Sequence, residues 1–460
     1  MARHLRRRRK GSAGSMHSED GGEYKLPERR RSLVSVWVQF IITVFVALSV
    51  FLTVVFLYPS DYVCVKYELP QRTSLEGPLA VNDILTKAER FLENQILGPE
   101  SLLVENEAIY TGTQDGVLVE IYNGKIRREI RFRNEPRGSY EQEPMCGRPL
   151  GIRRLNSEEI VVMDAYFGIF SVNFNRGTFK QIFDPSVEVD GESLKFLNDV
   201  DVVDEDLIIF TDSSSKWPRR DFLKIAMEGV PNGRVFTLIP STGEVNVLMK
   251  SLYFANGIQL FPDKKSFLVA ETMMARIKSF RFRPPKMSFV DEVAVDRLPF
   301  AQAVQSMLAV KSHEGDLPLH WISGPKRGTT EIFAENLPGL PDNIRLSTDG
   351  TFWVAMAGVR LHQQFSFIDF LADKIVARKL LLKLIPDPYW SVLYSKLKSR
   401  HAMFIELDPI GKIVSSAHDV DGMIMTDASE VVDDGEYLYF GSFHASFIAK
   451  LHKRLLRSMK

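Results

Sequence analysis

A repeated strand–turn–strand pattern is the feature that most constrains the fold of this chain. Runs of apolar residues end in a polar or small residue, and a turn and a second run follow. The segments IYTGTQDGVLVEIYNGK, VVMDAYFGIFSVNFNRG and LYFGSFHASFIAKL are three copies of this unit. Units begin near residues 109, 161, 208, 268, 353 and 438, and the first spacings of about 50 residues are typical of propeller blades. The pattern predicts an all-β fold, a six-bladed β-propeller.

The predicted strands are bounded by Gly, Asn and Asp, as hairpins require. The clearest are Ala108–Gly112, Val117–Tyr122, Ile160–Asp164, Leu207–Asp212, Arg234–Ile239, Phe267–Glu271, Phe352–Ala357, Met403–Leu407 and Tyr437–Gly441. Two long spacings predict insertions at about 283–327 and 364–400. The second insertion has apolar residues at helical spacing, and such helices would cap a binding site or rest on a membrane surface. The same spacing predicts a short helix over residues 81–97.

An uncharged apolar run of 25 residues, Leu33–Leu57, precedes the β-rich region. As a helix it would be about 37 Å long and would cross a hydrocarbon core of about 30 Å. A buried core helix would be shorter and less uniformly apolar. A cleaved signal peptide would start nearer the N-terminus and end at small residues, which this run does not. The run therefore predicts an uncleaved transmembrane signal anchor that binds the lipid bilayer.

The charges beside this run predict its orientation. Arg29, Arg30 and Arg31 precede it and Asp61 follows it, and positive residues stay on the cytoplasmic side. We therefore expect a single-pass type II protein of the plasma membrane or endoplasmic reticulum, with a cytoplasmic N-terminus. Residues 1–32 would be a disordered basic cytosolic tail, 58–80 a stalk, and 81–460 the lumenal or extracellular propeller.

The charge balance argues against a nucleic-acid-binding domain. Residues 1–35 contain 10 Lys and Arg against 4 Asp and Glu, although the whole chain has a net charge of zero. The remainder is therefore acidic, with a net charge of −6, whereas nucleic-acid-binding surfaces are basic. We expect no nucleic-acid partner.

Candidate chemistry rests on scattered oxygen ligands, because the chain has no nucleophile elbow, Walker loop, dinucleotide fingerprint or zinc-binding helix. These ligands, at strand and turn positions, are Glu100, Asn198, Asn256, Asp342 and Asn343. In a propeller one loop of each blade reaches the central channel, so such distant residues can meet. Two carboxylates with neutral amides suit Ca²⁺ better than Mg²⁺ or zinc. The alternative is that each residue only forms a turn.

Several longer motifs resemble the strictosidine synthase-like family over residues 87–452. They include EPMCGRPLGIR, FTDSSSKWPRRDF, FANGIQL, ENLPGLPDNIR and HDVDG. The resemblance implies a six-bladed propeller related to paraoxonases and gluconolactonases. It also implies that the five oxygen ligands bind calcium, because they match the catalytic-calcium ligands of paraoxonase-like enzymes.

The chain also departs from these relatives. Leu150 stands where paraoxonases have a catalytic histidine, and the second histidine, expected near Met163, is absent. Leu cannot accept a proton, so the paraoxonase type of base is not available here. The glutamate of strictosidine synthase would fall near Thr426–Ala428, which argues against alkaloid synthesis. The family's cysteine partner for Cys146 is not visible, so Cys146 is either free or bonded to Cys64.

Two functions follow from these residues. The first is a calcium-dependent hydrolase of small hydrophobic esters or lactones, similar to arylesterases, with Asp164, His444 and Glu430 as candidate bases. The second is a non-catalytic receptor or adhesion module that binds a protein partner and holds a structural calcium. The absent histidine pair and the membrane anchor favour the second function, whereas the complete ligand set favours the first.

Overall fold

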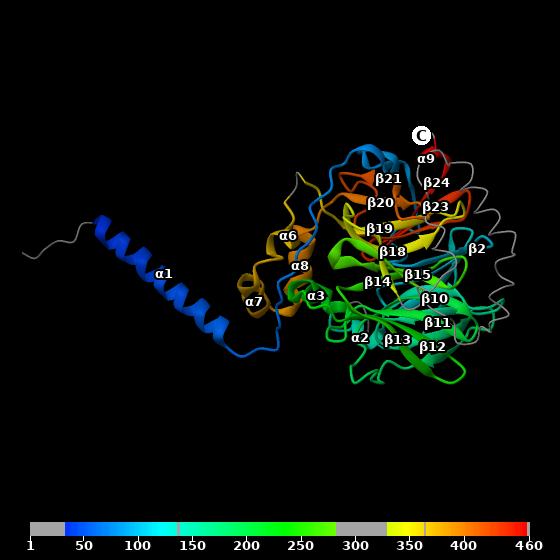
Figure 1. Ribbon diagram of the computed structural model, residues 1–460, viewed down its shortest axis with the longest axis horizontal. Coiled ribbons are helices and arrows are strands. Elements are labelled where there is room, and N and C mark those ends of the chain that lie inside the picture. Colours follow the sequence, from blue (N-terminus) through cyan, green and yellow to red (C-terminus); the bar gives the residue numbers. More distant parts are fainter. Residues whose placement is uncertain (1–32, 136–138, 282–328, 363–364, 458–460) are drawn as a thin grey trace, which may run out of the picture. The chain divides into compact units, whose positions relative to one another are not determined.

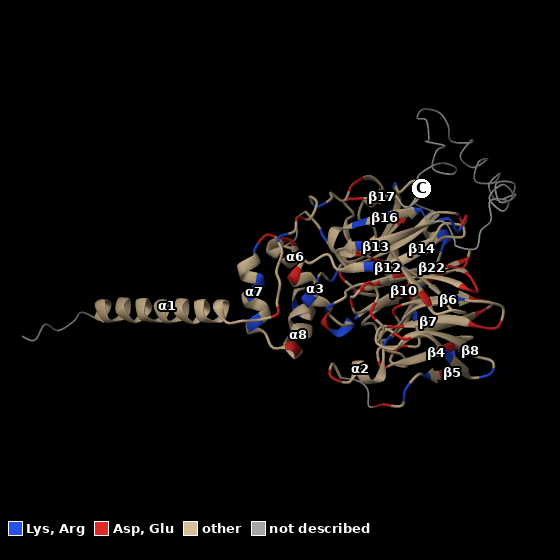
Figure 2. Cartoon of the chain, turned by 60° about the horizontal axis from the view of Figure 1, so that its bottom comes forward, with Lys and Arg blue, Asp and Glu red and all other residues tan. Residues whose placement is uncertain are grey.

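The computed structural model describes residues 33–135, 139–281, 329–362 and 365–457, and these form two units, residues 1–57 and 58–460. The first unit contains helix α1 (Leu33–Leu57), which has no charged residue (Figure 2) and no buried residue. Among the described helices, α1 is the one long and apolar enough to cross a membrane. The tail 1–32 and the predicted insertion 283–327 lie outside the described residues.

The second unit is a propeller of six four-stranded antiparallel sheets (Figure 1), which confirms the predicted fold class. The first strands of the blades contact one another and form the inner ring. Five blades use consecutive strands: β2 (Leu102–Glu105), β3 (Ala108–Gly112), β4 (Val117–Tyr122) and β5 (Lys125–Arg131); β6 (Pro149–Arg154), β7 (Ile160–Asp164), β8 (Gly168–Asn173) and β9 (Thr178–Phe183); β10 (Leu197–Asp204), β11 (Leu207–Asp212), β12 (Gly233–Ile239) and β13 (Glu244–Leu252); β14 (Ala255–Leu260), β15 (Ser266–Glu271), β16 (Arg276–Arg281) and β17 (Thr330–Ala334); β18 (Gly339–Leu346), β19 (Phe352–Val359), β20 (Ala402–Leu407) and β21 (Ile413–Asp419).

The sixth blade closes the ring with strands from both ends of the propeller. It contains β22 (Ala428–Asp433), β23 (Tyr437–Ser442), β24 (Ile448–His452) and β1 (Glu89–Phe91), and Arg90 pairs with Ala449. The helix predicted over residues 81–97 is therefore wrong. Its apolar residues Ile84, Leu85 and Ala88 pack among the last two blades, on a 3₁₀ turn (Ile84–Lys87) that leads into β1. Packing and strand pairing override the helical spacing.

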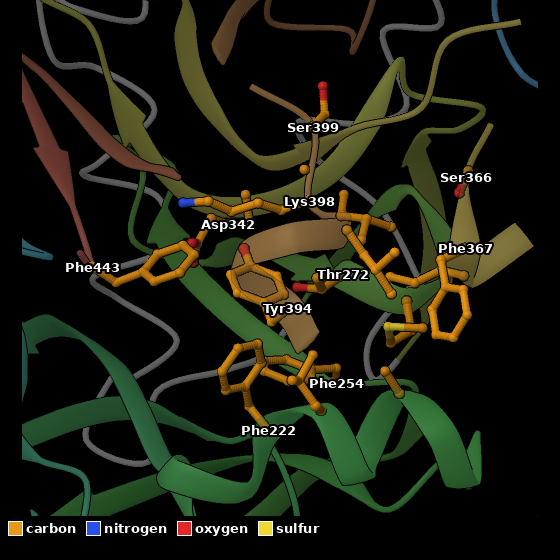
Figure 3. A pocket seen from close by; sticks show the side chains of 18 of the residues that line it. Phe222, Phe254, Thr272, Asp342, Ser366, Phe367, Tyr394, Lys398, Ser399 and Phe443 are labelled. Atoms are coloured by element: carbon orange, nitrogen blue, oxygen red, sulfur yellow. The ribbon is translucent and has the colours of Figure 1, made fainter. Parts of the chain in front are cut away.

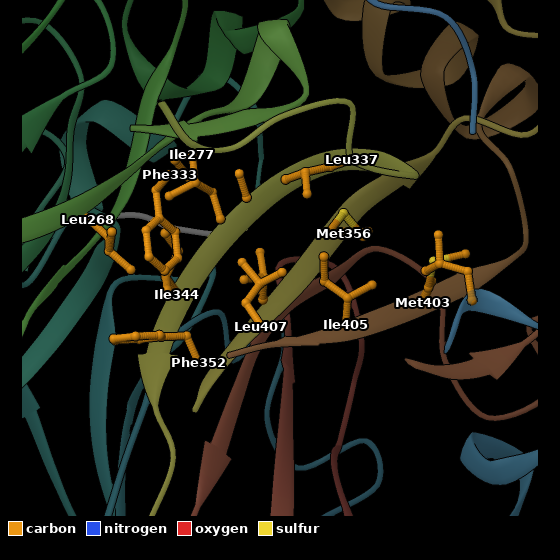
Figure 4. Close-up of a cluster of buried hydrophobic side chains, with 14 of the residues drawn as sticks. Leu268, Ile277, Phe333, Leu337, Ile344, Phe352, Met356, Met403, Ile405 and Leu407 are labelled. Atoms are coloured by element: carbon orange, nitrogen blue, oxygen red, sulfur yellow. The ribbon is translucent and has the colours of Figure 1, made fainter. Parts of the chain in front are cut away.

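The core lies between the blades, and both faces of a blade are covered by its neighbours. Strand β7 is buried at all five positions, as expected for a strand covered on two sides. Figure 4 shows one such cluster, in which Leu268 and Ile277 of the fourth blade face Ile344 and Phe352 of the fifth. Each such side chain contributes about 1.5–3 kcal/mol through burial, which fixes the inner strands in place.

Four helices gather on one side of the propeller in both views (Figures 1 and 2): α3 (Phe222–Glu228), α6 (Phe367–Leu371), α7 (Ile375–Leu384) and α8 (Asp387–Leu397). We call α6, α7 and α8 the cap; they occupy the predicted helical insertion. Met227 of α3, Leu371, Leu382 and Trp390 form the cluster that joins the four helices. Two single-turn helices, α2 (Glu143–Cys146) and α9 (Arg454–Arg457), lie elsewhere in the chain.

Residues 58–80, expected to be a stalk, lie against these helices. The Val65 amide donates to the Glu228 carbonyl at 2.8 Å, and the Tyr67 hydroxyl donates to the Ala226 carbonyl at 3.2 Å. Arg378 of α7 is fully buried and donates to the carbonyls of Met227 and Val65. The segment therefore has a defined path across α3 and α7.

Candidate metal centre and active site

The inner strands are irregular where the predicted ligands occur. Register shifts lie between Leu197 and Val200 in β10, between Ala255 and Ile258 in β14, and between Pro341 and Ile344 in β18. Such bulges turn side chains out of the regular alternation. The bulged segments contain Asn198, Asn256, Asp342 and Asn343, and Glu100 precedes β2 by two residues. The predicted ligands thus lie on the inner ring, at the same end of their blades.

Glycine allows these strands to approach closely. A Cβ atom on Gly257 would lie 2.5 Å from the Cα of Asn343, and one on Gly151 would lie 2.8 Å from the Cα of Asp199. No larger residue fits at either position without moving the neighbouring inner strand. The glycine after Asn256 therefore sets how near the fourth and fifth blades bring their oxygen ligands.

Three oxygens at this end of the ring are buried without a hydrogen-bond partner among the described residues. They are the Oδ1 atoms of Asn256, Asp342 and Asn343. Buried acceptors without partners are rare, and each one is a candidate for a missing cation or water. Asn198 is also buried, and its Nδ2 donates to Ser213 Oγ at 3.0 Å, which fixes the amide plane. The donor set therefore fits a hard cation such as calcium.

The two carboxylates of the set lie close enough to affect each other. Burial and the negative charge of Glu100 raise the pKa of Asp342 well above its ordinary value, although a hydrogen bond from Asn256 opposes the rise. A cation bound between the carboxylates would relieve this repulsion. Within the described part of the chain there is no group of three or more His, Cys, Asp or Glu side chains that could hold a metal, so the amide oxygens are essential to this site.

Arginines also compensate the charge of Glu100. Its Oε2 accepts from Arg148 Nη2 at 3.1 Å and lies 3.7 Å from Arg219 Nη2. Arg219 also donates to Glu143 Oε2 at 3.0 Å, whereas the Nε and Nη1 atoms of the fully buried Arg148 have no partner among the described residues. Glu100 is therefore held on one side by guanidinium groups.

An ion-pair network connects the inner strands. Arg345 of β18 donates to Asp199 Oδ2 at 2.7 Å, to Asp199 Oδ1 at 3.2 Å and to Ser101 Oγ at 3.1 Å, and its Nε donates to Glu430 Oε1. Burial alone would raise the pKa of Asp199, but Arg345 and Arg153 outweigh it and hold the pKa below its ordinary value. Glu430, one of the candidate bases, also accepts from the Leu102 amide and is occupied by structural contacts.

Asp164, the second candidate base, is fully buried at the end of β7. Its Oδ1 accepts from the amides of Tyr166 and Phe167 at 2.9 and 3.0 Å. Burial raises the pKa of Asp164 to about 6 in spite of these bonds. Its carboxylate therefore shapes the turn after β7, and it is not among the residues that line the cavity described below.

His444, the third candidate, follows Phe443 of the cavity wall, although His444, like Asp164, is not itself among the lining residues. Its Nδ1 lies 3.6 Å from Oδ2 of the buried Asp427, which also accepts from Lys398 Nζ and, at 2.9 Å, from the Tyr394 hydroxyl. Burial would raise the pKa of Asp427, but bonds from His444 and Lys398 keep it below its ordinary value. Asp427 also has a φ of 55°, a strained backbone region that is enriched at functional sites.

Four of the five predicted ligands line a cavity of about 390 Å³ beneath the cap, and Asn343 is not among the lining residues. Glu100, Asn198, Asn256 and Asp342 line its polar end, and the walls are apolar. Figure 3 shows Asp342, Lys398 and Tyr394 at one end and Phe254, Phe222 and Phe367 around the rest. The site thus combines an oxygen-rich floor with walls that suit a hydrophobic ligand.

Sequence reasoning missed the residues that come from the cap and from the loop before β22. Tyr394 and Lys398 are four residues apart on or next to α8, so they share one helix face, and this spacing is visible in the sequence. Their contacts with Asp427 are not visible, because they depend on how the cap packs on the sixth blade. Arg148 and Arg219 were likewise missed, although both lie in quoted motifs.

Comparison with known proteins places the chain in a family. Profiles described as "Strictosidine synthase" and "Strictosidine synthase-like, N-terminal" match residues 198–283 and 77–121. Adipocyte plasma membrane-associated protein from Gallus gallus is 38% identical over 379 residues, which cover 82% of this chain and 81% of that protein. The chain belongs to the strictosidine synthase-like family. An Arabidopsis thaliana member, strictosidine synthase-like 3, is 30% identical over 85% of this chain and 91% of its own length.

Solved propellers are more distant from this strictosidine synthase-like chain. Regucalcin from Agrobacterium tumefaciens, described as a calcium-binding protein, is 10% identical with a TM-score of 0.46 and covers 79% of this chain and 92% of its own. A gluconolactonase from Xanthomonas campestris is 14% identical, also with a TM-score of 0.46, and covers 86% of this chain and 99% of its own.

Two departures noted in the sequence can now be located in this strictosidine synthase-like chain. Leu150 lies in the β6 bulge, is 1% exposed and packs with Phe196 and Phe254, so no proton acceptor occupies that position. Cys64 and Cys146 are both free, and Cys146 is buried. Burial raises the pKa of the Cys146 thiol to about 11, so it is protonated at neutral pH.

Proposed function

We propose that this chain is a membrane-anchored, calcium-dependent hydrolase of ester or lactone bonds, similar to arylesterases. Helix α1 would anchor it as a type II protein, with the propeller on the lumenal or extracellular side of the plasma membrane or endoplasmic reticulum. The observation that carries the proposal is the group of buried oxygens on Asn256, Asp342 and Asn343 that have no hydrogen-bond partner among the described residues. Two of these residues, Asn256 and Asp342, line an apolar cavity together with Glu100.

Glu100, Asn198, Asn256, Asp342 and Asn343 would hold the ion. Calcium bound there would supply a Lewis acid that polarises a substrate carbonyl and stabilises negative charge on its oxygen. The chain's own part is binding and positioning. Phe222, Phe254 and Phe367 would hold the hydrophobic part of a small ester or lactone and exclude water from it.

His444 is the candidate base that the contacts support best. Asp427 stays ionised and would orient the imidazole through Nδ1, which leaves Nε2 to accept a proton from an attacking water. The side chain of His444 is 38% exposed, so it can exchange protons with solvent. We therefore expect His444→Ala to lower kcat, with metal affinity unchanged.

The test of the proposal is an assay of the full chain in detergent with phenyl acetate and a panel of lactones, with calcium or with a chelator. We expect turnover that requires calcium, and a loss of at least a hundredfold in Glu100→Gln. Terbium luminescence provides a readout of metal binding that does not depend on activity. Glu188→Gln is the matched control because Glu188 is exposed. Turnover that Glu100→Gln and chelation leave unchanged would refute the proposal.

The second candidate function is a non-catalytic receptor or adhesion module, and the apolar Leu150 is the observation that favours it. In that case calcium would only stabilise the propeller. Metal-dependent thermal stability without turnover of any ester or lactone, together with capture of a protein partner by the immobilised full chain, would support this alternative.

A further inference from the structure

The cap and Phe365, two residues before it, carry many exposed apolar side chains. Single exposed apolar residues are common on protein surfaces, but a group on consecutive elements indicates an interaction surface. Here eight of them fall between residues 365 and 397: Phe365, Phe370, Ile375, Val376, Leu384, Tyr389, Val392 and Leu397. The inner sides of the same helices pack on α3, so the helices are apolar on both sides.

The path of the chain after α1 indicates what covers this surface. Tyr58 follows Leu57 directly, so its Cα lies about 3.8 Å from the last residue of the apolar helix. Lys383 of α7 donates to the Tyr58 carbonyl, and Lys216 donates to the Asp61 carbonyl at 2.6 Å. The Val63 amide donates to Glu228 Oε1 at 2.9 Å. The chain is therefore bonded to α7 and α3 from its first residues after α1.

A helix that spans a bilayer ends near the headgroups, so the residue that follows it lies at the membrane surface. Lys383 and Lys216 donate to the carbonyls of the first and fourth residues after α1, so only a short tether separates the end of α1 from these bonds. A tether this short would allow the exposed apolar side chains of α7 and α8 to reach the same leaflet, in the manner of interfacial helices.

The cap surface is also continuous with the cavity. Phe365 and Leu397 are exposed, at 71% and 43%, and both line the cavity. They therefore form a rim between the outer surface of the cap and the interior. Beyond this rim the walls are apolar, with Ile368, Leu393 and Val359 among the lining residues.

We propose that the outer face of α6, α7 and α8 rests on the bilayer that holds α1, and that substrates enter the cavity from that bilayer between Phe365 and Leu397. This inference rests on the proposed function, which supplies the membrane anchor and the hydrolysis of an ester or lactone bond. It adds that the substrate comes from the membrane. The preferred substrates are long-chain esters or lactones dissolved in a membrane, and water-soluble short-chain esters enter the cavity without using the cap surface.

Docking is tested with the full chain reconstituted in phosphatidylcholine vesicles. A polarity-sensitive fluorophore is attached through Val392→Cys, in a Cys64→Ala background because Cys64 is only half-buried. Glu205→Cys is the matched control, since Glu205 is exposed and follows β10 at the end away from Asn198. We expect lipids with a nitroxide near the headgroup to quench the label at residue 392 at least threefold more than at 205. Equal quenching at both positions would overturn the docking proposal, and Tyr389→Cys repeats the test at a second site.

Substrate entry is tested with the triple variant Val376→Ser, Tyr389→Ser and Val392→Ser, none of which lines the cavity. We expect KM for a long-chain aryl ester in the vesicles to rise about fivefold or more, with KM for phenyl acetate unchanged. An equal change for both substrates, or none for either, would overturn the entry route. If neither ester is hydrolysed by the unmodified chain while the label at 392 is quenched, the proposed function fails and the docking stands.

Discussion

Replacing Arg345 by methionine tests whether the ion-pair network holds the inner strands together. The guanidinium joins β18 to β10 through Asp199, to β22 through Glu430 and to Ser101, which directly precedes β2. All four side chains are buried. Removing one partner of a buried ion pair costs about 3–5 kcal/mol, because the remaining charge stays buried without compensation. Arg345→Met leaves the carboxylates of Asp199 and Glu430 buried without their guanidinium partner. Arg153, 3.6 Å from Asp199, compensates one of them in part, so we expect a loss of about 4 kcal/mol.

The assay is urea unfolding of the full chain in detergent, followed by tryptophan fluorescence. Trp353 pairs with Arg345 across β18 and β19 and is 2% exposed, so it reports on this region. Arg176→Met is the matched control, since its ion pair with Glu158 is exposed and should contribute less than about 1 kcal/mol. Adding Asp199→Asn and Glu430→Gln to Arg345→Met should recover part of the loss. A loss below about 1 kcal/mol in Arg345→Met would refute the reasoning.

The network also predicts a pH dependence with a definite sign. With Arg345 present, the pKa of Asp199 lies below its ordinary value, whereas burial already raises that of Glu430. Without Arg345, burial would raise the pKa of Asp199 above its unfolded value and that of Glu430 further. The folded variant would then bind protons more readily, and its stability would increase as the pH falls towards 5. The difference in unfolding free energy between the variant and the original chain should therefore shrink at acidic pH. A difference that is constant between pH 8 and pH 5 would contradict this explanation.

Two further variants test other parts of the propeller. In Gly257→Ala the new Cβ would lie 2.5 Å from the Cα of Asn343, so we expect the affinity for terbium to fall at least tenfold. Unchanged affinity would contradict this expectation, because it would mean that the inner strands can separate without disturbing the metal ligands. His418 is buried, and burial together with His401 lowers its pKa to about 4. The unfolded state therefore binds the proton first, and up to about 3 kcal/mol of stability is lost as the pH falls from 6.5 to 4. Thermal unfolding should show that lowering the pH from 6.5 to 4 destabilises His418→Gln less than it destabilises the original chain.

The propeller fold could be predicted because the second strand of each blade gives a clear signal in the sequence. The six predicted starting points fall in β3, β7, β11, β15, β19 and β23, which are apolar and regular because neighbouring blades cover both faces. The inner strands were not predicted, since bulges and polar residues interrupt their alternation. The chain could not reveal β1 either, because Glu89–Phe91 is a strand only through pairing with β24, which lies more than 350 residues later.

The candidate site was predictable only where a family pattern supported it. Glu100, Asn256 and Asp342 were proposed as ligands from their chemistry and from the resemblance, and they line one cavity in the folded chain. The residues around them follow from packing. Asp427 meets Lys398 and Tyr394 because the cap folds back over the sixth blade, and no local spacing encodes that contact.

The pairing of β1 with β24 has a consequence for biosynthesis. During translation Glu89–Phe91 emerges long before Ile448–His452, and at about 5–20 residues per second the interval is about 20–70 s. Throughout this time β1 lacks its partner strand β24, and an unpaired strand edge can bind other chains. Correct assembly therefore depends on protecting that edge until synthesis is complete, and a ribosome that stops before residue 448 releases a ring that cannot close.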